Sequence, residues 1–223
     1  MRNEILRLAI PCFLLLILTS CKTDFSIDIY SSDMFLDENL DTPAKMKVEI
    51  PSCGQRSEYE RKVLALFGTQ SMAKIVGCEE EGMSSMMIVS LTAEISSTES
   101  DRDVVLFRQQ DQDKEHDGLL YELRGVKPFI HPEFLQRVNS LMQENMQTLS
   151  YSDISIEFVL NNDERADILV TGHGLWVDGQ PYQHYYRQPM ARRQRLELLV
   201  SNVTTDLVMQ GKFPVVLYIY RQK

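Results

Sequence analysis

The stretch that decides the fold is DILVTGHGLWVDGQPYQHYYR, residues 167–187, in which two strand-forming runs flank Asp178-Gly179. An Asp-Gly pair in this position is typical of a two-residue type I′ turn, because Asp tolerates positive φ and Gly adopts it freely. The turn predicts an antiparallel hairpin in which Trp176 pairs with Pro181. Pro181 then occupies a position that makes no ladder hydrogen bond, so its missing N–H costs nothing there.

The same register places His173 directly opposite His184 on one face of the hairpin. Two imidazoles on neighbouring strands can hold Zn²⁺ or another transition metal, but such a site needs a third ligand and none is apparent. The alternative is a polar cross-strand pair at the rim of the sheet. His173 and His184 are therefore the candidate metal residues, while no bound metal or other cofactor is predicted.

The opposite face of the hairpin is expected to carry Gly174, Trp176, Pro181 and Tyr185. Aromatic clusters of this kind can bind sugars or peptides, although they also serve simply to cover a sheet face. Both interpretations stay open at the level of sequence.

Apolar residues that alternate with polar ones predict further strands along the rest of the chain. These strands are expected at 25–29, 46–50, 72–77, 86–95, 103–109, 119–124, 154–158, 195–200 and 215–220. Residues 31–43 are acidic and are expected to form a loop. The pattern predicts an α+β fold with an antiparallel sheet and two to three helices. A division into two small subdomains near 126–131 is the alternative to one domain.

Three segments have helical character. Ser57 and Glu60 have the spacing of a capping box, which predicts a helix that begins there and ends at Gly68. Pro132 suits the first turn of a second helix. A short third helix is expected over 202–210. The apolar face of the second helix comprises Phe134, Leu135, Val138, Leu141 and Met142.

Two charged segments suggest ligands. Acidic residues between Asp111 and Glu122 have the spacing of an EF-hand loop, but His116 stands where the turn needs glycine, so a solvated hairpin tip is the alternative to calcium binding. The basic residues Arg187, Arg192, Arg193 and Arg195 could contact anionic lipid headgroups or form a solvated loop.

The first twenty residues differ in character from the remainder. Arg2 and Arg7 precede the apolar run Leu8–Leu18, which is too short for a membrane-spanning helix of roughly 20 residues. This order of charge and apolarity is typical of a cleaved secretory signal peptide. Residues 1–20 are therefore predicted to be a signal, and residues 21–223 a folded domain.

Leu18-Thr19-Ser20-Cys21 resembles the lipobox of bacterial lipoproteins. The resemblance implies that Cys21 becomes the N-terminus and carries a diacylglycerol and an N-acyl chain, for example palmitate, which together anchor the protein stably. Since Lys22 rather than Asp follows the cysteine, the periplasmic face of the outer membrane is favoured in a Gram-negative host. The strand predicted from Phe25 starts within about 13 Å of the anchor, so the domain is expected close to the bilayer.

Two cysteines remain after the signal and the anchor are set aside, namely Cys53 and Cys78. The expected compartment permits disulfides, so these two are predicted to pair and to clamp the helix between them onto the sheet. A CxxC redox pair is absent.

The whole predicted domain resembles small uncharacterised lipoproteins of bacterial genomes and prophages. The resemblance is carried by Cys21-Lys22-Thr23-Asp24, Leu160-Asn161-Asn162-Asp163 and Val177-Asp178-Gly179-Gln180. It implies a location in the cell envelope and no particular activity.

Composition narrows the possible functions. The chain of 223 residues has a net charge of −9, which disfavours nucleic acid as a partner, and it contains no GxSxG, SxxK or phosphate-binding glycine motif. We therefore expect a non-enzymatic envelope lipoprotein that binds an envelope protein or glycan. The alternatives are a small periplasmic metal-dependent hydrolase that uses His173 and His184, and a prophage-type exclusion lipoprotein that blocks a surface receptor.

Overall fold

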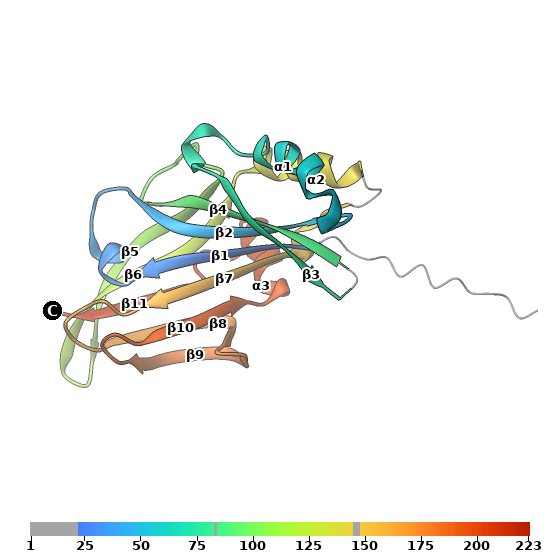
Figure 1. Ribbon diagram of the computed structural model, residues 1–223. Helices are drawn as coiled ribbons and strands as arrows, with labels where there is room; N and C mark the ends of the chain where they lie inside the picture. Colours follow the sequence, from blue (N-terminus) through green and yellow to red (C-terminus); the bar gives the residue numbers. More distant parts are fainter. Residues whose placement is uncertain (1–21, 83, 145–147) are drawn as a thin grey trace, which may run out of the picture.

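The computed structural model describes residues 22–82, 84–144 and 148–223, and places all eleven strands of this part in one sheet (Figure 1). The strands are β1 (Thr23–Tyr30), β2 (Leu40–Ile50), β3 (Lys74–Glu81), β4 (Ser84–Ser96), β5 (Val104–His116), β6 (Leu119–Ile130), β7 (Ile154–Asn161), β8 (Ile168–Val177), β9 (Gln180–Met190), β10 (Arg195–Val200) and β11 (Leu217–Gln222). The helices of the described ranges are α1 (Arg56–Leu64), α2 (Pro132–Gln143) and α3 (Asn202–Met209), with short 3₁₀ turns η1 (Ser32–Phe35), η2 (Cys53–Gln55), η3 (Thr69–Ser71) and η4 (Tyr151–Asp153).

The sheet is mixed, so the prediction of an antiparallel sheet is wrong for two of its strand pairs. β1 runs parallel to β7, and β4 runs parallel to β5 over a short contact. β1 and β7 are far apart in the sequence, whereas β4 and β5 are consecutive strands joined by residues 97–103, and short-range patterns reveal neither pairing. β6 continues across the boundary considered near 126–131, and the strands on both sides of it share the same sheet.

The sheet closes on itself through β8. Leu169 to Gly172 of β8 pair with β11, whereas Leu175 to Val177 pair with β10, which returns the strand order to its start. The change of partner falls at Gly172-His173-Gly174. A Cβ atom on Gly172 would overlap the Leu175 side chain, and one on Gly174 would overlap the Thr204 hydroxyl. The two glycines therefore let the strand turn this corner while it packs tightly.

The core lies inside this closed sheet and beneath α2. Phe25, Ile27 and Ile29 alternate inward along β1, as predicted, and all three are buried. Phe134 of α2 meets Phe25 edge to face, with ring centroids 6.3 Å apart. Burial of each large apolar side chain contributes roughly 1.5–3 kcal/mol. The predicted apolar face of α2 is confirmed, since each of its five residues is buried.

Helix α1 differs from its prediction at both ends. It begins at Arg56 without a side-chain cap, so Ser57 lies inside the helix and forms no capping box. The chain is already turning before this point, because the Ser52 hydroxyl accepts the Gly54 N–H at the start of η2. The helix ends at Leu64, short of the predicted Gly68. β2 likewise begins at Leu40, within the segment 31–43 that was expected to be a loop.

The predicted disulfide between Cys53 and Cys78 is present, with Cα atoms 5.7 Å apart. Cys53 begins η2, just before α1, and Cys78 lies in β3. The bridge therefore ties the start of α1 to the sheet, as expected. α1 and α2 lie beside each other above β4 (Figure 1), where Lys62 of α1 forms an ion pair of 2.7 Å with Glu144.

The acidic segment after Asp111 is extended rather than looped. β5 runs to His116, and Asp117-Gly118 make a tight turn into β6 with positive φ at both residues. The residues with EF-hand-like spacing thus lie along the strands of a hairpin, a geometry that does not surround an ion and that matches the solvated hairpin tip given as the alternative. The chain turns at a second Asp-Gly pair, whose signal was not recognised.

The helices of the described ranges are too short or too polar to cross a membrane.

Candidate functional site

Strand β9 forms an exposed edge of the sheet, at the bottom of Figure 1. In the described ranges it pairs with β8 alone. Large aromatic side chains are exposed on this hairpin: Trp176 by 42%, Tyr182 by 41% and Tyr186 by 57%. β9 contains no Asp or Glu, although the whole chain carries a net charge of −9. An aromatic, acid-free strip on an acidic protein is the compositional pattern of a binding surface.

The predicted register of the hairpin is confirmed. Asp178 and Gly179 have φ values of 48° and 77°, as a type I′ turn requires, and Trp176 lies opposite Pro181. The Asp178 side chain also fixes the turn to the body, because its Oδ1 accepts the Glu197 N–H at 3.0 Å. The Asp178 N–H in turn donates to the Glu197 carbonyl at 2.9 Å. The turn is therefore held in place by β10.

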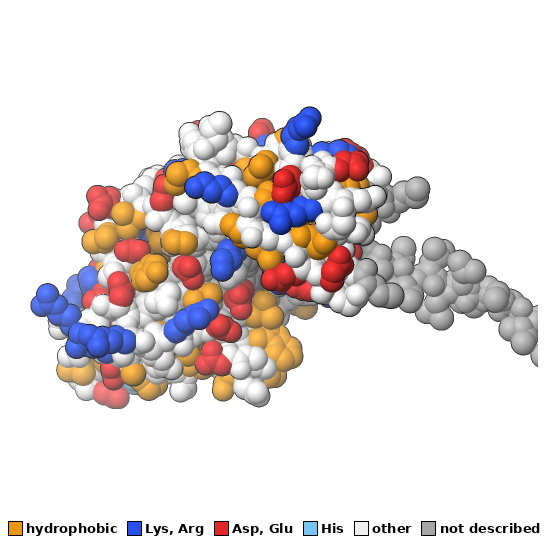
Figure 2. Space-filling model, in the orientation of Figure 1, with side chains coloured by type: hydrophobic (Ala, Val, Ile, Leu, Met, Phe, Trp, Pro, Cys, Tyr) orange, Lys and Arg blue, Asp and Glu red, His pale blue; other side chains and the backbone are white. Residues whose placement is uncertain are grey.

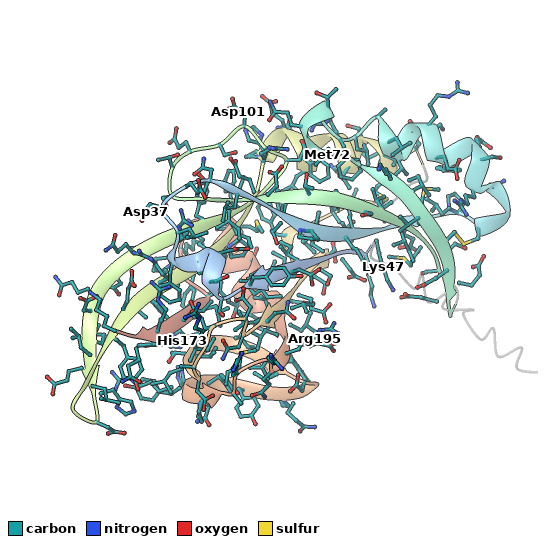
Figure 3. All side chains as sticks on the ribbon, turned by 60° about the vertical axis from the view of Figure 1, so that its left-hand side comes forward. Asp37, Lys47, Met72, Asp101, His173 and Arg195 are labelled. Carbon is teal, nitrogen blue, oxygen red and sulfur yellow. A yellow bond between two sulfur atoms is a disulfide. The ribbon has the colours of Figure 1, made fainter. Side chains whose placement is uncertain are left out.

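His173 and His184 face each other as predicted, with their Nδ1 atoms 3.1 Å apart. His173 (Figure 3) lies between Gly172 and Gly174. Its backbone N–H donates to the Val216 carbonyl at 3.2 Å, and its ring contacts the Phe213 ring edge to face. Burial, and then the neighbouring His184, lower the pKa of His173 below its ordinary value of 6.5. A hydrogen bond between the rings requires that one Nδ1 donates and the other accepts.

The structure brings no further metal ligand to this pair. Within the described ranges, no group of three or more His, Cys, Asp and Glu side chains could hold an ion. The contact between the two Nδ1 atoms is that of a polar cross-strand pair. A single hydrogen bond between two imidazoles suffices to account for the contact.

The aromatic residues of β9 are arranged differently from the simple alternation expected. A bulge shifts the register between Val170 and Gly172, and Arg187 adopts φ 46°. The Arg187 N–H donates to the Thr171 hydroxyl at 2.9 Å, and its guanidinium lies 5.0 Å from the ring centre of Tyr186. Bulges commonly re-aim a side chain, and no local sequence signal marks this one.

Arg187 also joins the hairpin to the tip of β5. Its Nη1 lies 3.2 Å from Nδ1 of His116, and its guanidinium is 6.0 Å from the ring of Tyr220. Tyr182 and Tyr185 stack edge to face with centroids 5.1 Å apart. These contacts restrict the aromatic side chains before any ligand arrives, which lowers the entropy that binding must cost.

The edge of β9 is protected against pairing with another strand. The Val177–Gln180 pair closes the turn, so Pro181 in the next pair has its nitrogen toward the free edge. Proline there offers no N–H to an added strand, and Pro189 adds a second interruption. The two prolines therefore leave this edge poorly suited to backbone pairing with a further strand.

The remaining predicted residues are spread around the molecule. Arg195 forms an ion pair of 3.1 Å with Glu197, and the backbone N–H of Arg192 donates to the Asp167 carboxylate. The basic segment therefore has acidic neighbours. Cys21, the predicted lipidation site, lies outside the described residues, as does the signal 1–20. β1 begins at Thr23, two positions beyond Cys21.

Comparison with known proteins places this fold in a family. Residues 23–223 match a family model described as a domain of unknown function, DUF7424. No curated protein and no solved structure matches the chain. Since the matched segment includes every described strand and helix, the chain belongs to the DUF7424 family.

Proposed function

We propose that the protein is a lipid-anchored lipoprotein of the cell envelope that acts by binding a partner protein through the β8–β9 hairpin. The observation that carries this proposal is the exposed, acid-free aromatic strip of β9. Tyr, Trp and Arg side chains dominate the energetics of protein interfaces, and Asp and Glu are depleted from their centres. On the face drawn in Figure 2, acidic and basic side chains are interspersed.

The anchor rests on the lipobox-like sequence that ends at Cys21 and on the position of β1. Only Lys22 separates Cys21 from the first residue of the sheet. The backbone N–H of Lys22 donates to the Glu49 carboxylate at 3.3 Å. With so short a connection, the acyl chains would hold the domain directly against the membrane. In a Gram-negative host we place it on the periplasmic face of the outer membrane.

Replacement of Cys21 by Ala tests the anchor. The variant is expected to stay as uncleaved precursor or to leave the membrane fraction, and its labelling with radioactive palmitate should disappear. Processing, labelling and membrane fractionation identical to those of the wild type would refute the lipoprotein proposal.

Site-specific photocrosslinking in intact cells tests the binding surface. A photoreactive phenylalanine at Tyr186 should give a discrete protein adduct, whereas the same probe at Tyr151, an exposed tyrosine on η4, should not. Co-sedimentation with isolated peptidoglycan, lost in Tyr186→Ala, would instead indicate a glycan partner. Equal adducts from both positions, or none from either, would contradict binding through β9.

A further inference from the structure

Two buried arginines line a cavity on the β5–β6 hairpin, away from the β9 edge. Arg108 of β5 is 4% exposed and Arg124 of β6 is 5% exposed. Gln110 pairs directly with Arg124 across the two strands, and Arg108 is two residues before Gln110, so all three share one face of the sheet. The cavity has a volume of about 570 Å³. Its lining also includes Ser97 and Thr98 and two acidic residues with exposed side chains, Asp37 and Glu99.

Among the residues that the structure describes, no carboxylate forms an ion pair with Arg108. Its Nε donates to the Ser97 hydroxyl at 3.2 Å, and its two Nη atoms donate to the carbonyl oxygens of Asp33 and Glu38 at 2.9 and 3.1 Å. These acceptors are neutral. A guanidinium has five N–H donors, so two of them remain for another acceptor.

Two neighbouring acidic residues, Glu122 and Glu164, are already occupied by other arginines. Glu122 accepts from Arg124 and from Arg221, each at 2.8 Å, and Glu164 accepts from Arg221 at 3.2 Å. Two carboxylates thus balance the charges of Arg124 and Arg221. Neither of these carboxylates pairs with Arg108. Burial, and then the nearby Arg124, lower the pKa of Arg108.

Arg124 is itself incompletely satisfied. Its Nε is buried and has no hydrogen-bond partner in the described structure. Asp37 (Figure 3) lies 3.8 Å from Nη2 of Arg124, but its side chain is fully exposed, so water screens its charge. A buried guanidinium N–H group without an acceptor costs free energy, and a bound anion that accepted from it would offset that cost.

We propose that this cavity binds a small oxyanion, a carboxylate or a phosphate group, with Arg108 and Arg124 as its charged donors. Guanidinium groups match both anions because their planar N–H donors align with two oxygens at once. The hydroxyls of Ser97 and Thr98 and the amide of Gln110 supply further donors around the cavity. This site is independent of the proposed function, since it shares no residue with β8 or β9.

Calorimetric titration of the purified protein with inorganic phosphate and with galacturonate, at constant ionic strength in chloride, tests the proposal. Gln110→Glu places a carboxylate beside Arg124 and leaves both arginines in place, and it should weaken binding at least tenfold. Gln112→Glu adds the same charge on the same strand at a residue outside the cavity lining, and it should change binding less than twofold.

Arg108→Gln should also abolish binding, with thermal unfolding used to establish that the variant is folded. Binding of phosphate alone, galacturonate alone or both supports the site and identifies the anion it prefers. The proposal is overturned if neither probe binds saturably at millimolar concentrations, or if Gln110→Glu and Gln112→Glu bind equally.

Discussion

Gly174 and Thr204 approach each other so closely that a Cβ atom on the glycine would overlap the threonine hydroxyl. Gly174 also has φ 60°, which L-residues rarely adopt. Gly174→Ala should therefore lower the free energy of unfolding by about 2–4 kcal/mol, from backbone strain and overlap together. Urea denaturation followed by circular dichroism measures this loss.

Gly179→Ala is the matched control for that substitution. Gly179 has φ 77°, but nothing lies near its missing Cβ atom. Only the strain of positive φ applies, so the expected loss is about 1 kcal/mol. Equal losses in the two variants would mean that close packing at the β8 corner does not matter.

The pKa of His173 should depend on its neighbour His184. His184→Asn removes one charge and leaves the burial of His173, so the pKa of His173 should rise but stay below its ordinary value. NMR titration of the imidazole Hε1 signals measures it. An unchanged pKa of His173 in this variant would show that His184 does not influence it.

The same shift fixes the sign of a pH effect on stability. Because the pKa of His173 is lowered in the folded protein, the unfolded chain binds more protons as the pH falls below about 6.5. His173 should therefore reduce stability progressively in that range and have no such effect above it. His173→Gln should flatten the dependence of the unfolding midpoint on pH between neutrality and mild acid.

Loss of the disulfide should destabilise the fold without changing its architecture. The bridge spans 25 residues, which corresponds to about 3 kcal/mol in the chain-entropy model. Reduction of the wild type and the double substitution Cys53→Ser with Cys78→Ser should give similar losses in urea. A reductant should not affect the double variant further, and a further loss would point to another reducible bond.

Asp163 should contribute stability that acid removes. Burial alone would raise the pKa of its carboxyl, but hydrogen bonds from Ser32 and Ser31 outweigh burial and hold the pKa below its ordinary value of 3.8. The stabilisation is therefore present above the unfolded pKa and is lost as the pH falls through the folded one. Asp163→Asn should cost about 1 kcal/mol at neutral pH. Its difference from wild type should shrink below about pH 4, and a constant difference would exclude this carboxylate as the cause.

The sequence predicted what depends on neighbouring residues. Asp178-Gly179 with Pro181 determined a turn and its register, and the His173–His184 pair followed from it. The apolar spacing after Pro132 likewise predicted the buried face of α2. These signals are local, since turn chemistry and helical period are properties of a few consecutive residues.

The rest depends on contacts between distant residues. The parallel pairing of β1 with β7 joins segments more than 100 positions apart, and no local pattern encodes it. Charged residues after Asp111 indicated a loop, yet they form the end of β5. Both faces of this end of the β5–β6 hairpin are exposed to solvent, so a strand can carry charged side chains there. The arginine cavity was missed, although Arg108 directly follows the apolar run Val104–Phe107, an unusual place for a charge.

The position of β1 between β2 and β7 has a consequence for the order in which the protein assembles. β2 can pair with β1 early, but the other side of β1 stays open until residues 154–161 become available for pairing. During that interval one edge of an apolar strand is unprotected, as in other slow-folding sheets with distant pairings. A chaperone that shields nascent or exported chains would find its target at the first strand, and substitutions that weaken β7 should increase aggregation through β1.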